Sequence, residues 1–317
     1  MTINRRNFLK GSLALTGGLL MPSYIASCNS REDEYDVVVY GGTSSGIVAA
    51  VQAARLGRSV VLIEPSDHLG GLTTGGLGST DLGTTDAIGG ISREFYQRVR
   101  KYYDNESVWT WEPTRISSAG DAMWGFEPHV AKTIYSQMLG ELSIPVVMKS
   151  RLLLNQQGIS KRRNRITAIK TEDGNVYRGK FFIDATYEGD LMAMAGVSYH
   201  VGREANSVYD ETLNGIQKVR THNHIFPGFV DPYIVPGNKG SGILPGVHGE
   251  NPGVDFEGDH RVQAYCFRMC LTDVEENRVA FAKPEGYDEL EYELLFRNFE
   301  APLQLFPPCL QPGRKRW

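Results

Sequence analysis

The stretch that most constrains the fold runs from Tyr35 to Glu64 and reads YDVVVYGGTSSGIVAAVQAARLGRSVVLIE. A β-branched run, a glycine-rich turn, a segment of helix formers and a second apolar run predict the order strand, turn, helix, strand. Gly57 stands where helices commonly end, and Pro65 stops the second strand. Together these features predict a βαβ unit, and therefore a parallel sheet covered by helices.

The turn of this unit has most of the glycine pattern of a dinucleotide site. Gly41 permits a tight turn and Gly46 allows close packing of helix on strand, so that backbone N–H groups can meet a pyrophosphate. Glu64, 18 residues after Gly46, is placed to bind ribose hydroxyls and to disfavour a 2′-phosphate. Thr43 replaces the middle glycine of G-x-G-x-x-G, which weakens the motif taken alone. A parallel α/β unit with an ordinary glycine turn is the alternative.

Residues 1–28 have the composition of an export signal and are set aside from the fold. Arg5-Arg6 opens a stretch that resembles the twin-arginine motif, and the run that ends at Cys28 resembles a bacterial lipobox. An ordinary secretory signal, with Cys28 incidental, is the alternative. Because twin-arginine export carries folded proteins, the signal agrees with a cofactor loaded before export. We expect a periplasmic or cell-surface lipoprotein, joined to its lipid on Cys28 by a polar tether of residues 29–34.

Length, charge and missing motifs exclude several classes of function. The 317 residues suffice for a large core and two domains, and the net charge of −4 gives no reason to expect a nucleic acid partner. The sequence has no long apolar run, P-loop or H-E-x-x-H. His222 and His224 lack a third metal ligand at matching spacing, so we expect no metal site. Cys266 and Cys270 fit no zinc or redox pattern, and we expect them to be buried.

Two further segments carry chemistry. Residues 68–78 read HLGGLTTGGLG, directly after the βαβ unit. Glycines beside small hydroxyl residues indicate backbone lying against a flat ligand, although a purely structural loop is the alternative. Residues 184–191 read DATYEGDL and follow an apolar run. Without the first motif, they would indicate only a strand followed by an acidic helix start.

The segments VVVYGGTSSG, HLGGLTTGG and DATYEGDL, with the acid between the first two, resemble the FAD-dependent oxidoreductases of the glutathione-reductase-like class. The resemblance is closest to a bacterial exported group related to fumarate reductase-type flavoproteins. It implies an α/β fold with a Rossmann-like FAD-binding domain, made of a parallel sheet and a β-meander, and a mixed α+β substrate or cap domain. The first motif would cradle the FAD pyrophosphate, and the second glycine segment would run along the flavin. The implied FAD-binding residues are Gly41, Gly42, Thr43, Ser45, Gly46, Glu64, Gly70, Gly71, Thr73, Thr74, Ala185, Thr186 and Asp190.

Other patterns divide the chain into domains. Helical patterns cover residues 91–103 and 128–139, with Pro128 at the first helical position. A β-meander is predicted for residues 144–157, 164–174 and 175–186, with a hairpin turn at Asp173-Gly174. We expect a discontinuous FAD-binding domain (residues 35–90 and 140–200), a cap insertion (residues 91–139) and a substrate domain (residues 201–317).

The last third of the sequence gives fewer signals. In the resembled group, VGRE and QAYCFRMCLT segments belong to the substrate region, which implies that Arg203 and Arg268 bind an anionic or polyol substrate. Substrate oxidation needs a general base near the flavin, and His222, His224 and Glu211 are the candidates. The final FPPCLQPGRKRW replaces the strand, turn and helix that close the flavin site in the resembled group. We therefore expect a truncated or frameshifted product.

These features predict an FAD-dependent oxidoreductase that transfers a hydride between flavin and a small molecule, sugar-derived or a hydroxy acid. Two alternatives stay open. One is a flavin-free or defective surface lipoprotein that retains the fold. The other is an NAD-dependent dehydrogenase with a single nucleotide unit, against which the DATYEGDL segment argues.

Overall fold

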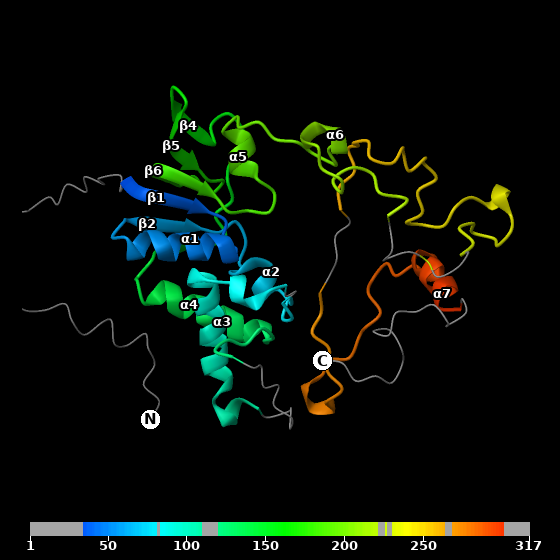
Figure 1. Ribbon diagram of the computed structural model, residues 1–317, viewed down its shortest axis with the longest axis horizontal. Helices are drawn as coiled ribbons and strands as arrows, with labels where there is room; N and C mark the ends of the chain where they lie inside the picture. Colours follow the sequence, from blue (N-terminus) through cyan, green and yellow to red (C-terminus); the bar gives the residue numbers. More distant parts are fainter. Residues whose placement is uncertain are drawn as a thin grey trace, which may run out of the picture.

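The computed structural model describes residues 34–80, 83–109, 120–220, 226, 230–263 and 268–300. One six-stranded sheet organises the first half of the molecule, in the order β3-β2-β1-β6-β5-β4 (Figure 1). The four strands β3, β2, β1 and β6 run parallel, and β5 and β4 complete the sheet in antiparallel fashion. This is the predicted α/β fold with a Rossmann-like parallel sheet and a β-meander. The strands are β1 (Glu34–Tyr40), β2 (Val60–Ile63), β3 (Val146–Val147), β4 (Ile159–Arg162), β5 (Arg165–Lys170) and β6 (Val176–Asp184).

Strand β1 lies at the centre of the sheet, and its side chains are buried on both faces. Val37 and Val39 point to one face, which is covered by helices, whereas Val38 and Tyr40 point to the other. The second face packs against residues of the meander and of the helix after β6, among them Leu152, Ile169 and Leu191. Burial on both faces explains why β1 reads as a continuous apolar run rather than an alternating one.

Helices α1 (Ser44–Arg55), α3 (Gly90–Tyr103) and α4 (Pro128–Gly140) form the layer on the first face (Figure 1). Helices α3 and α4 begin and end within one residue of the ranges predicted for them. Phe95 of α3 and Ile134 of α4 are buried in the same core as Val39 and Ile47. The described part of the predicted cap insertion thus packs against the same face of the sheet as α1. The predicted domain boundaries stay a prediction.

The meander differs from the predicted one in two strands. Of residues 144–157, only Val146–Val147 form a strand, and this strand pairs in parallel with β2. The hairpin partner of β5 is instead β4, because residues 159–162 pair with it in antiparallel fashion. The predicted turn at Asp173-Gly174 is confirmed: Gly174 has φ +88° and Thr171 N donates to Asn175 O at 3.0 Å. Strand β6 then runs unbroken to the centre of the sheet, where it pairs with β1. The last strand of the meander is therefore also a strand of the parallel sheet.

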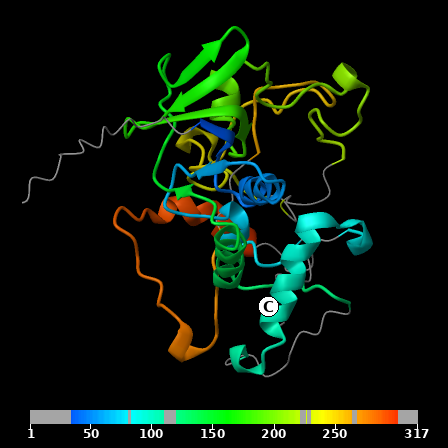
Figure 2. The same cartoon turned by 90° about the vertical axis from the view of Figure 1, so that its left-hand side faces the viewer.

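The described residues after Gly196 form long connections with few regular elements (Figure 2). Isolated backbone bridges and side-chain contacts hold parts of this region together. Arg297 donates to the carbonyl oxygens of Asp231, Tyr233 and Ile234 at 2.6–3.1 Å. The remaining helices are α2 (Gly71–Thr74), α5 (Asp190–Met194), α6 (Asn206–Tyr209) and α7 (Glu293–Glu300), and the 3₁₀ turns are η2 (Thr85–Ala87), η3 (Glu106–Val108), η4 (Lys239–Ser241), η5 (Glu275–Asn277) and η6 (Glu289–Tyr292).

Among the described residues, no helix has both the length and the apolar character needed to cross a bilayer. The predicted export signal, residues 1–28, lies outside the described part of the chain.

Candidate functional site

The turn between β1 and α1 is shaped by two glycines that exclude side chains. Gly41 has φ +103°, and a Cβ on it would lie 2.7 Å from the carbonyl carbon of Ala185. A Cβ on Gly46 would lie 1.9 Å from the carbonyl oxygen of Gly41. Helix α1 therefore starts directly at the end of β1, with its N-terminal backbone close to the sheet edge. This is the geometry that brings backbone N–H groups to a pyrophosphate.

Thr43 explains the departure from the glycine pattern. Its Oγ1 donates to the carbonyl oxygen of Ala185 at 2.7 Å and accepts from Gly46 N at 3.4 Å. The same hydroxyl lies 2.9 Å from Ser45 Oγ, and Thr43 is buried. Thr43 thus caps α1 and fastens the first motif to the second.

The second motif is fixed by the carboxylate of Asp184 at the end of β6. Its Oδ1 accepts from the backbone N and Oγ1 of Thr186 at 3.0 and 2.7 Å, and its Oδ2 accepts from Met192 N at 2.8 Å. Ala185 N donates to the carbonyl oxygen of Tyr40 at 2.8 Å. The predicted residues Ala185 and Thr186 therefore lie beside the first turn, and Asp190 begins α5 just after them.

Glu64 is buried next to the first turn. Its Oε2 accepts from Gly42 N at 2.6 Å, and its Oε1 accepts from the backbone N and Oγ of Ser66 at 2.7 and 2.5 Å. A carboxylate offers about four acceptor positions, so three filled ones leave about one for a ribose hydroxyl. The predicted acid is thus oriented by the turn that it follows.

The second glycine segment lies against the first turn. Gly70 N donates to the carbonyl oxygen of Gly42 at 2.7 Å, and Ser44 Oγ donates to the carbonyl oxygen of Gly70 at 3.1 Å. Ser44 Oγ also lies 2.6 Å from Thr73 Oγ1. The Oγ1 of Thr74 donates back to Leu69 O at 2.6 Å. The structure therefore brings together Gly41, Gly42, Thr43, Ser45, Gly46, Glu64, Gly70, Gly71, Thr73, Thr74, Ala185 and Thr186.

We call the place where these residues meet the junction. Sequence reasoning missed three of its residues. Ser44 joins the two glycine segments, as described above. The hydroxyl of Tyr187 accepts a hydrogen bond from Leu72 N at 2.8 Å. The position of Tyr187 inside the DATYEGDL segment is the one sequence signal that could have pointed to it. Tyr135 reaches the junction from α4, where it stacks on Phe95 with ring centroids 4.6 Å apart. Burial raises the pKa of the Tyr135 hydroxyl, which neighbours the hydroxyls of the two segments, so it stays protonated at neutral pH.

The junction fits FAD in two respects that the structure itself supplies. Cβ atoms at Gly41 and Gly46 would clash with the backbone of Ala185 and of Gly41, so glycine at both positions permits the tight turn that brings backbone N–H groups to a pyrophosphate. The Glu64 carboxylate sits beside that turn with acceptor capacity left for a ribose. These residues would hold the cofactor; the role of each stays a prediction.

The predicted substrate residues are dispersed. Arg203 forms a two-pronged ion pair with Asp259, with nitrogen–oxygen distances of 2.9 and 2.5 Å. Arg268 is exposed and adjoins the second glycine segment, because a Cβ on Gly76 would lie 3.0 Å from the Arg268 Cβ. Glu211 lines an open hollow of about 330 Å³ after α6. The two histidine candidates, His222 and His224, lie outside the described residues.

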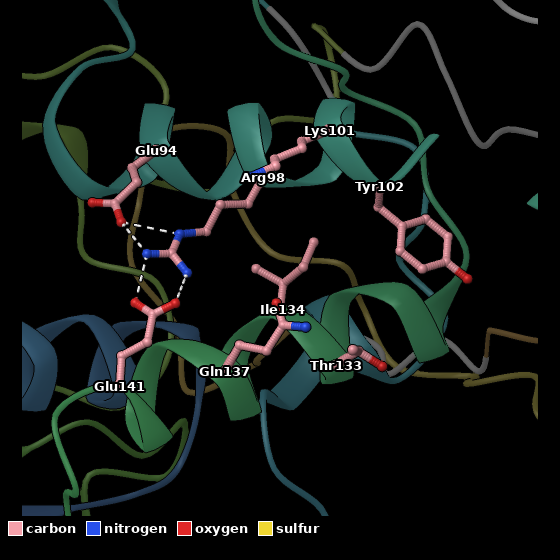
Figure 3. A pocket seen from close by; sticks show the side chains of 8 residues that line it. All are labelled: Glu94, Arg98, Lys101, Tyr102, Thr133, Ile134, Gln137 and Glu141. Atoms are coloured by element: carbon pink, nitrogen blue, oxygen red, sulfur yellow. Dashed lines mark hydrogen bonds and ion pairs between the residues drawn. The ribbon is translucent and has the colours of Figure 1, made fainter. Parts of the chain in front are cut away.

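A further hollow lies elsewhere, between α3 and α4 (Figure 3). It has a volume of about 650 Å³. Arg98 spans its end by pairing with Glu94 at 2.9 Å and with Glu141 at 2.6 Å. The pKa of both carboxyl groups is lowered, chiefly by a hydrogen bond from Arg55 to Glu94 and by one from Arg98 to Glu141. The Arg98 guanidinium donates to these two carboxylates through Nε, Nη1 and Nη2. None of the predicted cofactor residues lines the hollow.

The described residues contain no group of three or more histidine, cysteine or acidic side chains arranged to hold a metal ion. The prediction that Cys270 is buried is wrong: it is exposed and free. The described residues around it, 268–274, form no helix or strand, and Cys266 lies outside the described residues.

A family model described as FAD dependent oxidoreductase matches residues 36–316. Among solved structures, the chain is similar to L-proline dehydrogenase from P. horikoshii, with 18% identity over 55% of this chain and 59% of that chain and a TM-score of 0.36. It is also similar to L-amino acid deaminase from Proteus vulgaris, with 15% identity over 54% and 51% and a TM-score of 0.37. A flavin-containing monooxygenase from Stenotrophomonas maltophilia matches with 20% identity over 55% and 43% and a TM-score of 0.31. The chain spans less than two thirds of each of these proteins.

Proposed function

The chain belongs to the FAD dependent oxidoreductase family, and from this premise we propose that it transfers a hydride between a small polar substrate and FAD. Sugar-derived molecules and hydroxy acids are the substrate classes we favour. Bound FAD supplies a ring system that accepts or donates a hydride, while the protein binds and orients the substrate. The observation that carries the proposal is the junction of three motif segments, far apart in sequence, around one glycine cradle.

The residues of the junction divide the work of binding. Gly41 and Gly46 permit the tight turn that presents backbone N–H groups to the pyrophosphate, and the Glu64 carboxylate accepts hydrogen bonds from the adenosine ribose. The segment that contains Gly70 and Thr73 lies next to the cradle and lines the path toward the flavin. Its backbone amides would serve as hydrogen-bond donors there, since Thr74 Oγ1 already donates to Leu69 O.

Arg268 is the better supported of the two arginine candidates for the substrate. It adjoins the second glycine segment and is exposed. Arg203 already pairs with Asp259, so an anionic substrate would have to compete with that carboxylate. A guanidinium presents several N–H donors in a planar fork, which suits a carboxylate or neighbouring hydroxyls.

Oxidation of an alcohol carbon to a carbonyl releases a hydride to the cofactor and a proton to a base. His222, His224 and Glu211 stay the candidates for that base. Glu211 follows α6, which lies apart from α2 (Figure 1). The two histidines are therefore the first to replace in an experiment.

We further propose export and lipid anchoring. The support is the Arg5-Arg6 pair and the lipobox-like run before Cys28. A folded, cofactor-loaded protein is the cargo that twin-arginine export accommodates, so the export signal and the cofactor proposal are mutually consistent.

Anaerobic titration of the flavin-loaded protein tests the proposed reaction. Sugars, polyols and hydroxy acids are added singly, and bleaching of the flavin absorbance reports hydride transfer. In Arg268→Ala, the substrate that bleaches wild-type protein should bind about 10- to 100-fold more weakly, the expected loss for a charged hydrogen bond, with FAD content unchanged. Arg278→Ala, at an exposed arginine that pairs with nearby Glu275, is the matched control. Failure of all three compound classes to bleach a bound flavin would contradict the proposed substrate class.

A further inference from the structure

Tyr187 lies at the contact between the second motif and the glycine segment after the βαβ unit. Its hydroxyl oxygen accepts from Leu72 N at 2.8 Å, across 115 residues of sequence. Leu72 is the second residue of the four-residue helix α2 (Gly71–Thr74). The first backbone N–H groups of a helix have no partner within it, so the tyrosine satisfies a donor that the short helix leaves open.

The fit around this hydroxyl is close. A Cβ on Gly71 would lie 2.2 Å from the Tyr187 hydroxyl oxygen and 3.3 Å from the Thr43 Cβ. Glycine at position 71 is therefore what lets the first turn, the second segment and the second motif meet. Gly70, its neighbour, has φ +100° and no side chain caps α2 from that position. The turn thus depends on contacts made by other parts of the chain.

The ring of Tyr187 contributes little to the core. The residue is 61% exposed, unlike the buried tyrosines of β1 and α4. Burial of apolar area therefore does not account for its position at the junction. Its hydroxyl, by contrast, is held by the hydrogen bond from Leu72 N.

We propose that Tyr187 is a positioning residue for the cofactor: its hydroxyl holds the turn of residues 70–74 in the orientation that meets the flavin. The inference rests on the proposed function, in which this turn lines the path toward the flavin. Removing only the hydroxyl should leave the sheet and its core intact while loosening the turn. The effect on FAD would pass through the backbone of α2, not through the tyrosine itself.

Tyr187→Phe tests the proposal, with Tyr199→Phe as the matched control because Tyr199 is 60% exposed and lies outside the junction. The dissociation constant for FAD is measured by quenching of flavin fluorescence. Loss of one neutral hydrogen bond should weaken binding by about three- to tenfold in Tyr187→Phe and leave the control unchanged. The absorption spectrum of the bound flavin should also shift, since its surroundings change.

Hydrogen exchange of the apo-protein separates positioning from a general loss of stability. In Tyr187→Phe, amide exchange should rise in the peptide that contains Leu72 and stay at the wild-type rate in β1 and α1. Wild-type affinity in the variant, or weaker affinity without faster exchange at Leu72, would overturn the inference. If the wild-type protein itself fails to bind FAD, the proposed function fails first and the inference falls with it.

Discussion

Thr43 donates a hydrogen bond from Oγ1 to the carbonyl oxygen of Ala185 at 2.7 Å, across 142 residues of sequence. The bond joins the turn after β1 to the residue after β6, the two strands that pair at the centre of the sheet. The threonine that interrupts the glycine pattern therefore connects the two halves of the site.

We predict that Thr43→Val, which keeps the shape and removes the hydroxyl, destabilises the protein by about 1–3 kcal/mol because a buried carbonyl loses its donor. Urea unfolding followed by circular dichroism measures this. Thr133→Val, on the exposed face of α4, should change stability by less than about 0.5 kcal/mol. Equal stability of Thr43→Val and wild type would mean that the bond to Ala185 contributes nothing.

Gly46→Ala should be one of the most damaging single-methyl changes in the chain. Its Cβ would lie 1.9 Å from the Gly41 carbonyl oxygen, which is backbone and cannot rotate away. We predict destabilisation of at least about 1–3 kcal/mol, together with loss of FAD binding. Gly140→Ala is the control, because a Cβ there meets nothing within 4 Å and the change should be neutral or stabilising by up to about 1 kcal/mol. Thermal unfolding of the two variants side by side decides the point.

The Arg203–Asp259 pair predicts a defined dependence of stability on pH. The Arg203 guanidinium lowers the pKa of Asp259 from 3.8 to about 2. A carboxyl group whose pKa is lower in the folded state stabilises the fold above its unfolded pKa, and this stabilisation disappears as pH falls through the folded value. Asp259→Asn should therefore be less stable than wild type at neutral pH, and the difference should shrink between pH 3.8 and about 2. Arg203→Gln should remove the same pH dependence; a difference that persists unchanged to pH 2 would contradict this assignment.

Lipid anchoring makes a prediction that does not depend on the fold. Expressed in a bacterium with twin-arginine export, the wild-type protein should incorporate radiolabelled palmitate and sediment with membranes. Cys28→Ser should do neither, and Arg5→Lys with Arg6→Lys should leave the protein in the cytoplasm. Membrane association that survives Cys28→Ser would show that another feature holds the protein there.

The sequence predicted the parts of the fold that depend on local pattern. Strand β1, helix α1 and strand β2 could be predicted because apolar runs and glycines lie next to each other in the chain. The proximity of the DATYEGDL segment to the first turn came only from the resemblance. The bond from Thr43 to Ala185 could not be predicted, since neither residue type indicates a partner so far away.

The errors have physical causes as well. Residues 144–157 look like a long strand because many of them are apolar, yet only Val146–Val147 form a strand, and β4 is the hairpin partner of β5. Leu152 adds an isolated antiparallel bridge to Thr171. The position of Tyr187 depends on how α2 turns, which a sequence pattern does not report. The described residues beyond Gly196 pack through scattered ion pairs and carbonyl contacts, and such contacts leave no periodic signal.

The visible absorption spectrum of the purified wild-type protein tests the central claim most directly. If the junction of the three motif segments binds FAD, the protein should be yellow, and the flavin released on denaturation should be FAD at about one molecule per chain. A colourless protein that neither retains flavin nor quenches the fluorescence of added FAD would contradict the account.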